Sequence, residues 1–184
     1  VAGALVHPHL HAELAGRLRA DRRLEAEHGI RVGLGVLLQR DALRVEEVEV
    51  EVADAVETRQ SYLRNTAILK TEIIDRDGAI VEIIDFAPRY RQFGRTYRPT
   101  AFIRRVRATR GSPTIAVRLR PTTDWGSARA ETTRGSNHIR YLCTDMVLRL
   151  TTNCPASHIL NERSFRLEKP LGFFLGPDEG FDAD

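Results

Sequence analysis

Hydrophobic and polar positions alternate along the chain from residue 45 onward. Val48, Val50 and Val52 are separated by Glu49 and Glu51, a period of two that is typical of a strand with one apolar and one polar face. Segments with a strand pattern cover residues 45–52, 62–75, 79–86, 100–107, 114–120, 128–132, 138–143, 146–152, 164–167 and 172–175. About ten short strands at this spacing predict a mainly β protein built as an antiparallel β-sandwich.

Turn-forming residues lie between these predicted strands. Asp77 and Gly78 form the pair that accepts positive φ and closes a β-hairpin. The segments RGSP (110–113) and RGSN (134–137) also interrupt the alternation. Turns at these intervals favour consecutive antiparallel strands.

The front of the chain follows a different pattern. Leucines at helical spacing predict one amphipathic helix over residues 8–28. Residues 30–38 are apolar and fit either a short strand or a loop packed on the core. We therefore divide the chain into a helical front segment, residues 1–44, and a β-sandwich domain, residues 45–184.

Composition places the chain among folded globular proteins. Of its 184 residues, 42% are hydrophobic and 29% are charged, and no apolar run reaches the roughly 20 residues of a membrane span. The net charge of +3 gives only a modest field for holding a polyanion. Cys143 and Cys154 are too few for a disulfide framework, and a signal peptide has no support at the N-terminus. We expect reduced thiols, a cytoplasmic protein and no membrane partner.

No familiar catalytic or ligand-binding motif is present in the sequence. His7, His9 and His11 lie near the start of the sequence with a proline among them, and we interpret them as a solvated helix start and not as a metal site. Gly33 and Gly35 lack the third glycine and the βαβ unit of a dinucleotide fingerprint. No serine lies in a Gly-x-Ser-x-Gly motif. We predict no metal, no cofactor and no catalytic residue in this chain.

Acidic residues are the remaining candidates for catalysis, because glycoside hydrolysis uses two carboxyl groups. Most of them, such as Glu49, Glu72 and Glu82, alternate with apolar residues and are expected to face water. Asp85 differs, since it follows two isoleucines and precedes a Phe-Ala-Pro segment. We interpret Asp85 as a buried structural carboxylate that accepts backbone hydrogen bonds and fixes a turn.

Residues 90–110 combine seven arginines with four aromatic side chains. Basic residues interleaved with aromatic ones are typical of surfaces that bind single-stranded nucleic acid. Alternation, however, puts Phe102 and Arg104 on one side of a strand and Ile103 and Arg105 on the other, which divides the charge between two faces. We therefore expect no nucleic-acid partner. An Arg-rich nucleic-acid-binding domain is kept only as an alternative to the function expected below.

A series of short motifs follows in order along the β-rich part of the chain. They are YLRNTAILKT (62–71), DG (77–78), IDFAP (84–88), IRRV (103–106), RG (110–111), VRLRP (117–121), DWG (124–126) and LGPDE (175–179). Together they resemble the N-terminal domain of glycoside hydrolase family 15, the glucoamylase-like and trehalase-like proteins. The resemblance covers about residues 45–184, and the ordered set is far more specific than any single motif.

The resemblance implies a large β-sandwich, of the super-sandwich type, that packs against a catalytic (α/α)6 barrel. The family hydrolyses α-glucosidic bonds with two glutamates of that barrel, so it implies no catalytic residue here. We therefore expect a non-catalytic domain whose partner is the barrel of a parent protein that acts on an α-glucan or a trehalose-type carbohydrate. The other alternative is a stand-alone carbohydrate-binding module, with Trp125, Tyr97 and Tyr141 as candidates for stacking on sugars.

Overall fold

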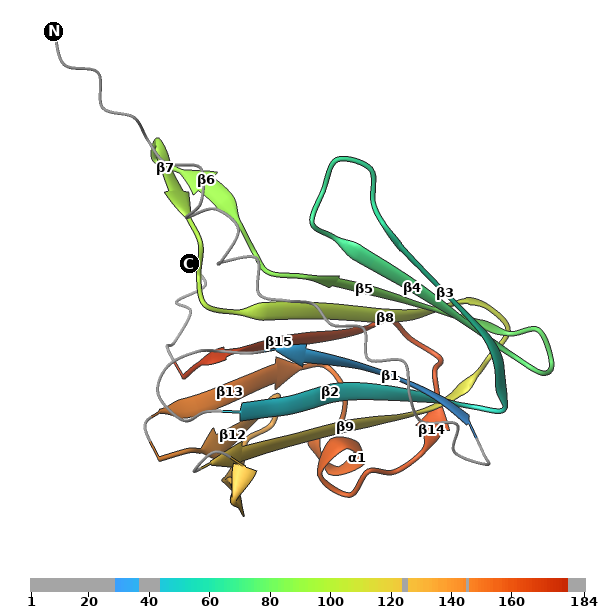
Figure 1. Cartoon of the computed structure of the whole chain (residues 1–184). Helices are drawn as coiled ribbons and strands as arrows, with labels where there is room; N and C mark the ends of the chain where they lie inside the picture. Colours follow the sequence, from blue (N-terminus) through green and yellow to red (C-terminus); the bar gives the residue numbers. More distant parts are fainter. Residues whose placement is uncertain (1–28, 37–43, 124–125, 145, 179–184) are drawn as a thin grey trace, which may run out of the picture.

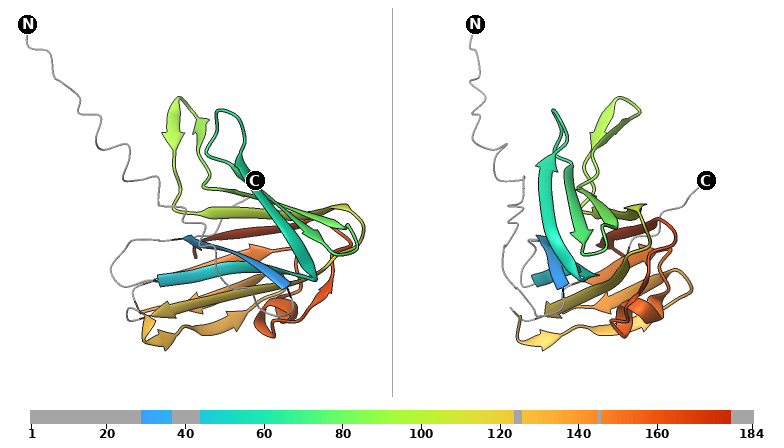
Figure 2. Two further views of the ribbon diagram at one scale, coloured as in Figure 1. Left: turned by 45° about the vertical axis from the view of Figure 1, so that its right-hand side comes forward. Right: turned by 90° about the vertical axis from the view of Figure 1, so that its right-hand side faces the viewer.

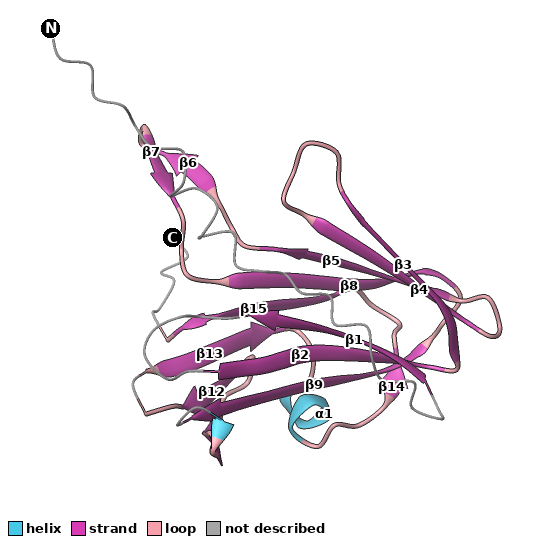
Figure 3. Ribbon diagram, viewed as in Figure 1, coloured by secondary structure: helices cyan, strands magenta, loops and turns pink. Residues whose placement is uncertain are grey.

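The computed structural model describes residues 29–36, 44–123, 126–144 and 146–178. Over these residues the protein is mainly β, with antiparallel strands and one short α-helix (Figures 1 and 3). The prediction of a mainly β, antiparallel chain is confirmed. The helix predicted over residues 8–28 lies outside the described residues.

The smaller of the two main sheets has five strands. Four of them lie in the order β1-β2-β9-β10, and β14 also pairs with β9. Their bounds are β1 (Gly29–Val36), β2 (Arg44–Ala53), β9 (Thr114–Thr123), β10 (Ala128–Arg129) and β14 (Phe165–Arg166). Strand β1 pairs with β2 along its length. Residues 29–36, assigned to the front segment from the sequence, are thus part of the same sheet as β2.

The larger sheet has eight strands in the order β11-β12-β13-β15-β8-β5-β4-β3. Their bounds are β3 (Ala55–Tyr62), β4 (Leu69–Asp75), β5 (Ile80–Phe86), β8 (Phe102–Arg110), β11 (Glu131–Arg134), β12 (His138–Leu142), β13 (Val147–Thr152) and β15 (Leu171–Pro177). The single strand predicted over residues 62–75 is wrong, because a loop separates β3 from β4 there. Asp54, with a φ of 51°, is the one residue between β2 and β3, so the chain changes sheet at that point.

A single buried apolar cluster contains side chains of both sheets. The smaller sheet contributes alternate residues of β2 and β9, namely Val48, Val50, Val52, Ile115, Val117 and Leu119. The larger sheet contributes alternate residues such as Ile73, Val81, Ile83, Val106, Ile139, Leu148, Leu150, Phe173 and Leu175. The period-two pattern of the sequence therefore identifies the inward face of these strands.

Two segments project away from the sheets on the same side of the molecule (Figures 1 and 2). One is the loop between β3 and β4. The other is a hairpin of β6 (Tyr90–Gln92) and β7 (Arg95–Tyr97), which lies between β5 and β8 in the chain. The hairpin was not predicted from the sequence, because strands of three residues are too short to establish a period.

Candidate functional site

The three aromatic residues proposed to stack on sugars have different surroundings. Tyr97 is 37% exposed on β7, and its ring stacks on Tyr90 of β6 with centroids 5.4 Å apart and 12° between the planes. Tyr141 on β12 is 2% exposed, so its ring belongs to the core and offers no face to a ligand. Burial also raises the pKa of its hydroxyl. Trp125 lies outside the described residues.

Exposed aromatic and large apolar side chains concentrate on the two projecting segments. They are Tyr62 and Leu63 at the end of β3, and Tyr90, Phe93 and Tyr97 on the β6–β7 hairpin. Phe93 at the tip is 88% exposed. Isolated exposed apolar residues are normal, whereas a concentration of them marks an interaction surface. We refer to the hairpin with its flanking residues, 89–98, as the aromatic arm.

A buried ion pair joins two strands of the larger sheet and reaches the smaller one. Arg104 of β8 and Asp85 of β5 are direct cross-strand partners. The guanidinium donates through Nε and Nη2 to the two carboxylate oxygens of Asp85, at 2.7 and 2.8 Å. Its Nη1 donates to the backbone carbonyl of Val48 in β2. The prediction that Asp85 is buried is confirmed, but its partner is an arginine side chain and not the backbone of a turn.

The turn carboxylate is a different residue, Asp75. Its side chain accepts hydrogen bonds from the backbone N–H groups of Asp77 and Ala79, at 3.0 and 2.8 Å. Gly78 completes this turn with a φ of 78°. The hairpin predicted from the Asp-Gly pair is confirmed between β4 and β5.

A row of charged side chains crosses four strands on the outer face of the larger sheet. Arg59, Glu72, Glu82 and Arg107 are consecutive cross-strand partners on β3, β4, β5 and β8. Lys70 lies between the two carboxylates, 2.8 Å from Glu72 and 3.6 Å from Glu82. Arg107 donates to Glu82 at 2.6 Å. Glu82 is 8% exposed, so the expectation that it faces water is wrong.

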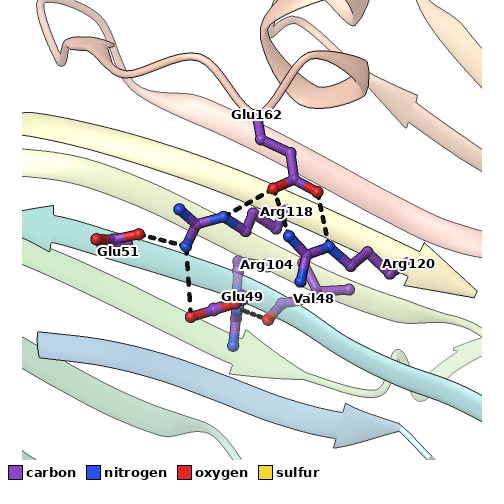
Figure 4. A network of polar contacts seen from close by, with 7 residues as sticks. All are labelled: Val48, Glu49, Glu51, Arg104, Arg118, Arg120 and Glu162. Atoms are coloured by element: carbon purple, nitrogen blue, oxygen red, sulfur yellow. Dashed lines mark hydrogen bonds and ion pairs between the residues drawn. The ribbon is translucent and has the colours of Figure 1, made fainter. Parts of the chain in front are cut away.

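A second polar network covers the outer face of the smaller sheet (Figure 4). Arg118 of β9 binds Glu51 of β2 and lies 3.7 Å from Glu49 of the same strand. On its other side, Nε of Arg118 donates to Glu162 at 3.1 Å. Arg120 donates to the same carboxylate at 2.6 Å through Nε. Glu49 is 7% exposed, so it too does not face water as expected.

Glu162 reaches this network from the segment after the helix α1 (Ala156–Leu160), which packs against β9. Its φ of 51° is left-handed, a conformation usually left to glycine after a helix. The backbone N–H of Arg163 bonds to the carbonyl of His158 at 2.8 Å, which closes the helix end. At this position the carboxylate has two arginine partners, Arg118 and Arg120.

These carboxylates have the wrong electrostatics for a glycosidase acid. The hydrogen bond from Arg107 lowers the pKa of Glu82, and the hydrogen bond from Arg120 lowers the pKa of Glu162. A general acid in glycoside hydrolysis needs a raised pKa, so that it is protonated when the leaving group departs. Among the described residues, no group of three His, Cys, Asp or Glu side chains could hold a metal ion. The ion pairs therefore suit a structural role.

Glu162→Gln is expected to remove part of the acid sensitivity of the fold. The pKa of Glu162 in the folded chain is below its usual value of 4.5, so its ion pairs stabilise the fold above that pH. This contribution is lost as the pH falls through the folded pKa. We expect the variant to be less stable at pH 7, by about 1 kcal/mol, and the difference from the wild type to be smaller at pH 3. Thermal melts at both pH values measure this, and an equal difference at both would contradict it.

Both cysteines are free. Burial raises the pKa of Cys154 to about 11, so its thiol is protonated near neutral pH. Among the described residues, no helix is long and apolar enough to cross a membrane.

Comparisons with known protein families, curated proteins and solved structures found no match to this chain.

Proposed function

We propose that this chain is a non-catalytic β-sandwich domain of the kind found in glycoside hydrolase family 15. In this proposal it packs on and stabilises an (α/α)6 barrel that hydrolyses α-glucosidic bonds. The two main sheets and their common core support a sandwich of this kind. The assignment to that family rests on the ordered motifs of the sequence.

The observation that carries the proposal is the buried pair of Asp85 and Arg104. Asp85 belongs to the IDFAP motif and Arg104 to the IRRV motif, 19 residues further along the chain. The two motifs lie on neighbouring strands and form one buried contact. Motifs that depend on each other in this way support the interpretation that the series specifies one fold. They also give these residues a structural explanation that needs no catalytic role.

An assay of sugar hydrolysis tests the proposal. The purified chain is expected to release no glucose from maltose, isomaltose or trehalose, whereas the full gene product with the barrel hydrolyses at least one of them. Glu72→Gln with Glu82→Gln in the isolated chain is the matched control, because it removes a pair of carboxylates that lie directly across from each other on neighbouring strands. Hydrolysis by the isolated chain that this double variant abolishes would overturn the non-catalytic proposal.

The exposed stacked pair of Tyr90 and Tyr97 favours a second candidate, a stand-alone carbohydrate-binding module. Such a module binds maltooligosaccharides without a barrel. Titration of the isolated chain, observed by calorimetry, separates the two candidates. Binding that is lost in Tyr97→Ala would support the module, and the absence of heat would remove it.

A further inference from the structure

The aromatic arm has no structural partner among the described helices and strands. Strands β6 and β7 contact each other and make no substantial contact with another described element. The ribbon shows the hairpin projecting past the ends of β5 and β8, away from the sheets (Figure 2). An isolated two-stranded hairpin is at best marginally stable in water. Contacts with the described core therefore do not explain why the chain forms this arm.

The tip of the arm carries a residue that the turn itself does not favour. Phe93 and Gly94, the two central residues of the turn, have φ values of 49° and 73°. A two-residue hairpin loop with positive φ at both positions prefers Asn-Gly, Asp-Gly or Gly-Gly. A phenylalanine in this left-handed conformation is strained, and Phe93 is also 88% exposed. A side chain so placed is suited to insertion into a pocket of a binding partner.

The positive charge of the arm has no carboxylate partner among the described residues. Arg89, Arg91, Arg95 and Arg98 lie within it, and no aspartate or glutamate occurs from residue 86 to residue 123. In the part of the chain that the structure describes, no ion pair involves any of these four arginines. Some arginines of the sheets, in contrast, are bound by carboxylates, as Arg104 is by Asp85 and Arg107 is by Glu82. Arginine and large aromatic residues are the side chains that contribute most to protein interfaces.

The end of β15 lies beside the base of the arm. Leu175 of β15 pairs with Phe102 at the start of β8. A β-carbon at Gly176 would lie 3.4 Å from Cβ of Ala101 and 3.5 Å from the carbonyl oxygen of Thr100. These two residues belong to the segment that connects β7 to β8. The C-terminal end of β15 therefore lies next to the segment on which the arm is mounted.

We propose that the aromatic arm is the element that docks on the catalytic barrel of the same polypeptide. Phe93 enters an apolar pocket of the barrel, and the arginines of the arm pair with carboxylates around that pocket. The stacked rings of Tyr90 and Tyr97 form the rigid base of the contact. This inference rests on the proposed function, since that function supplies the barrel.

Limited proteolysis of the isolated chain and of the full gene product tests the docking. Trypsin can cut the arm after Arg89, Arg91 and Arg95, and mass spectrometry identifies the fragments. We expect the arm of the full gene product to be cut at least about tenfold more slowly than that of the isolated chain, because docking buries it. Phe93→Asn in the full gene product is expected to restore the fast cleavage and to lower the melting temperature.

The same substitution has the opposite expected effect in the isolated chain. Asn-Gly suits the turn better than Phe-Gly, so Phe93→Asn should keep or raise the melting temperature of that chain. Val56→Asn is the matched control, because Val56 is 58% exposed on β3 outside the arm and should change neither readout.

Two results separate failure of the docking from failure of the proposed function. A full gene product that hydrolyses none of the three sugars overturns the proposed function, and the docking with it. A gene product that hydrolyses one of them, while its arm is cut as fast as in the isolated chain, overturns the docking alone.

Titration of the isolated chain with a single-stranded oligonucleotide is the last experiment. Tight, salt-dependent binding that is lost in Arg91→Gln with Arg95→Gln would assign the arm to nucleic acid and overturn the docking.

Discussion

Asp85→Ala is expected to lower the free energy of unfolding by about 3–5 kcal/mol, because it leaves the guanidinium of Arg104 buried without a counter-charge. Asp85 and Arg104 are 1% and 0% exposed. The hydrogen bond from Arg104 to the carbonyl of Val48 holds the guanidinium between the two sheets, which prevents the side chain from turning toward water. Urea denaturation at pH 7, followed by circular dichroism, measures the loss.

Two further variants isolate the contribution of the unpaired charge. Asp85→Leu combined with Arg104→Met removes both charges and should recover a large part of the loss, because apolar residues of similar size can replace a buried ion pair. Arg59→Met removes an exposed ion pair with Glu57 and should leave the urea midpoint unchanged. An Asp85→Ala chain with the wild-type midpoint would contradict the prediction.

Alternation in the sequence predicts the strands that supply the core. Val48, Val50 and Val52 are buried as expected, because apolar side chains on one face of a strand must leave water together. The same pattern missed β3, whose residues are mostly exposed at the edge of the larger sheet. An edge strand buries little on either face, so its sequence carries only a weak period.

The polar contacts could not be predicted from the pattern alone. Alternation places Arg104 on the side of Phe102 and Val106, which is the buried side. An arginine at such a position gives no sign of its partner, since Asp85 is 19 residues away and becomes its neighbour only through the register of β5 and β8. Glu49 and Glu82 are buried for a similar reason, because arginine or lysine side chains of adjacent strands lie close to them.

The aromatic arm was visible in the sequence only as a composition. Residues 90–110 stand out in the sequence for their arginines and aromatic residues, but the strand pattern covers only residues 100–107 of them. The local signal was Gly94, preceded by Phe93 and flanked by short polar and aromatic segments. Phe-Gly is not a favoured hairpin pair, so propensity argued against the turn that the structure contains. A conflict of this kind between local preference and fold is typical of functional sites.

Gly111→Ala is expected to destabilise the fold by about 3 kcal/mol, from two separate causes. Gly111 lies in the turn between β8 and β9 with a φ of 70°, a conformation that is strained for alanine. The new β-carbon would also lie 2.7 Å from Cβ and 3.2 Å from Cα of Ala79. Because Ala79 is buried, the backbone of one of the two residues must move to relieve this contact.

Gly78→Ala is the matched control, because its φ is 78° and no atom lies within 4 Å of the added carbon. The free energy of unfolding of Gly78→Ala should therefore fall only by the cost of the backbone conformation, about 1 kcal/mol. Urea denaturation of both variants measures the two losses. Equal losses would show that strain alone determines the cost and that the contact with Ala79 relaxes freely.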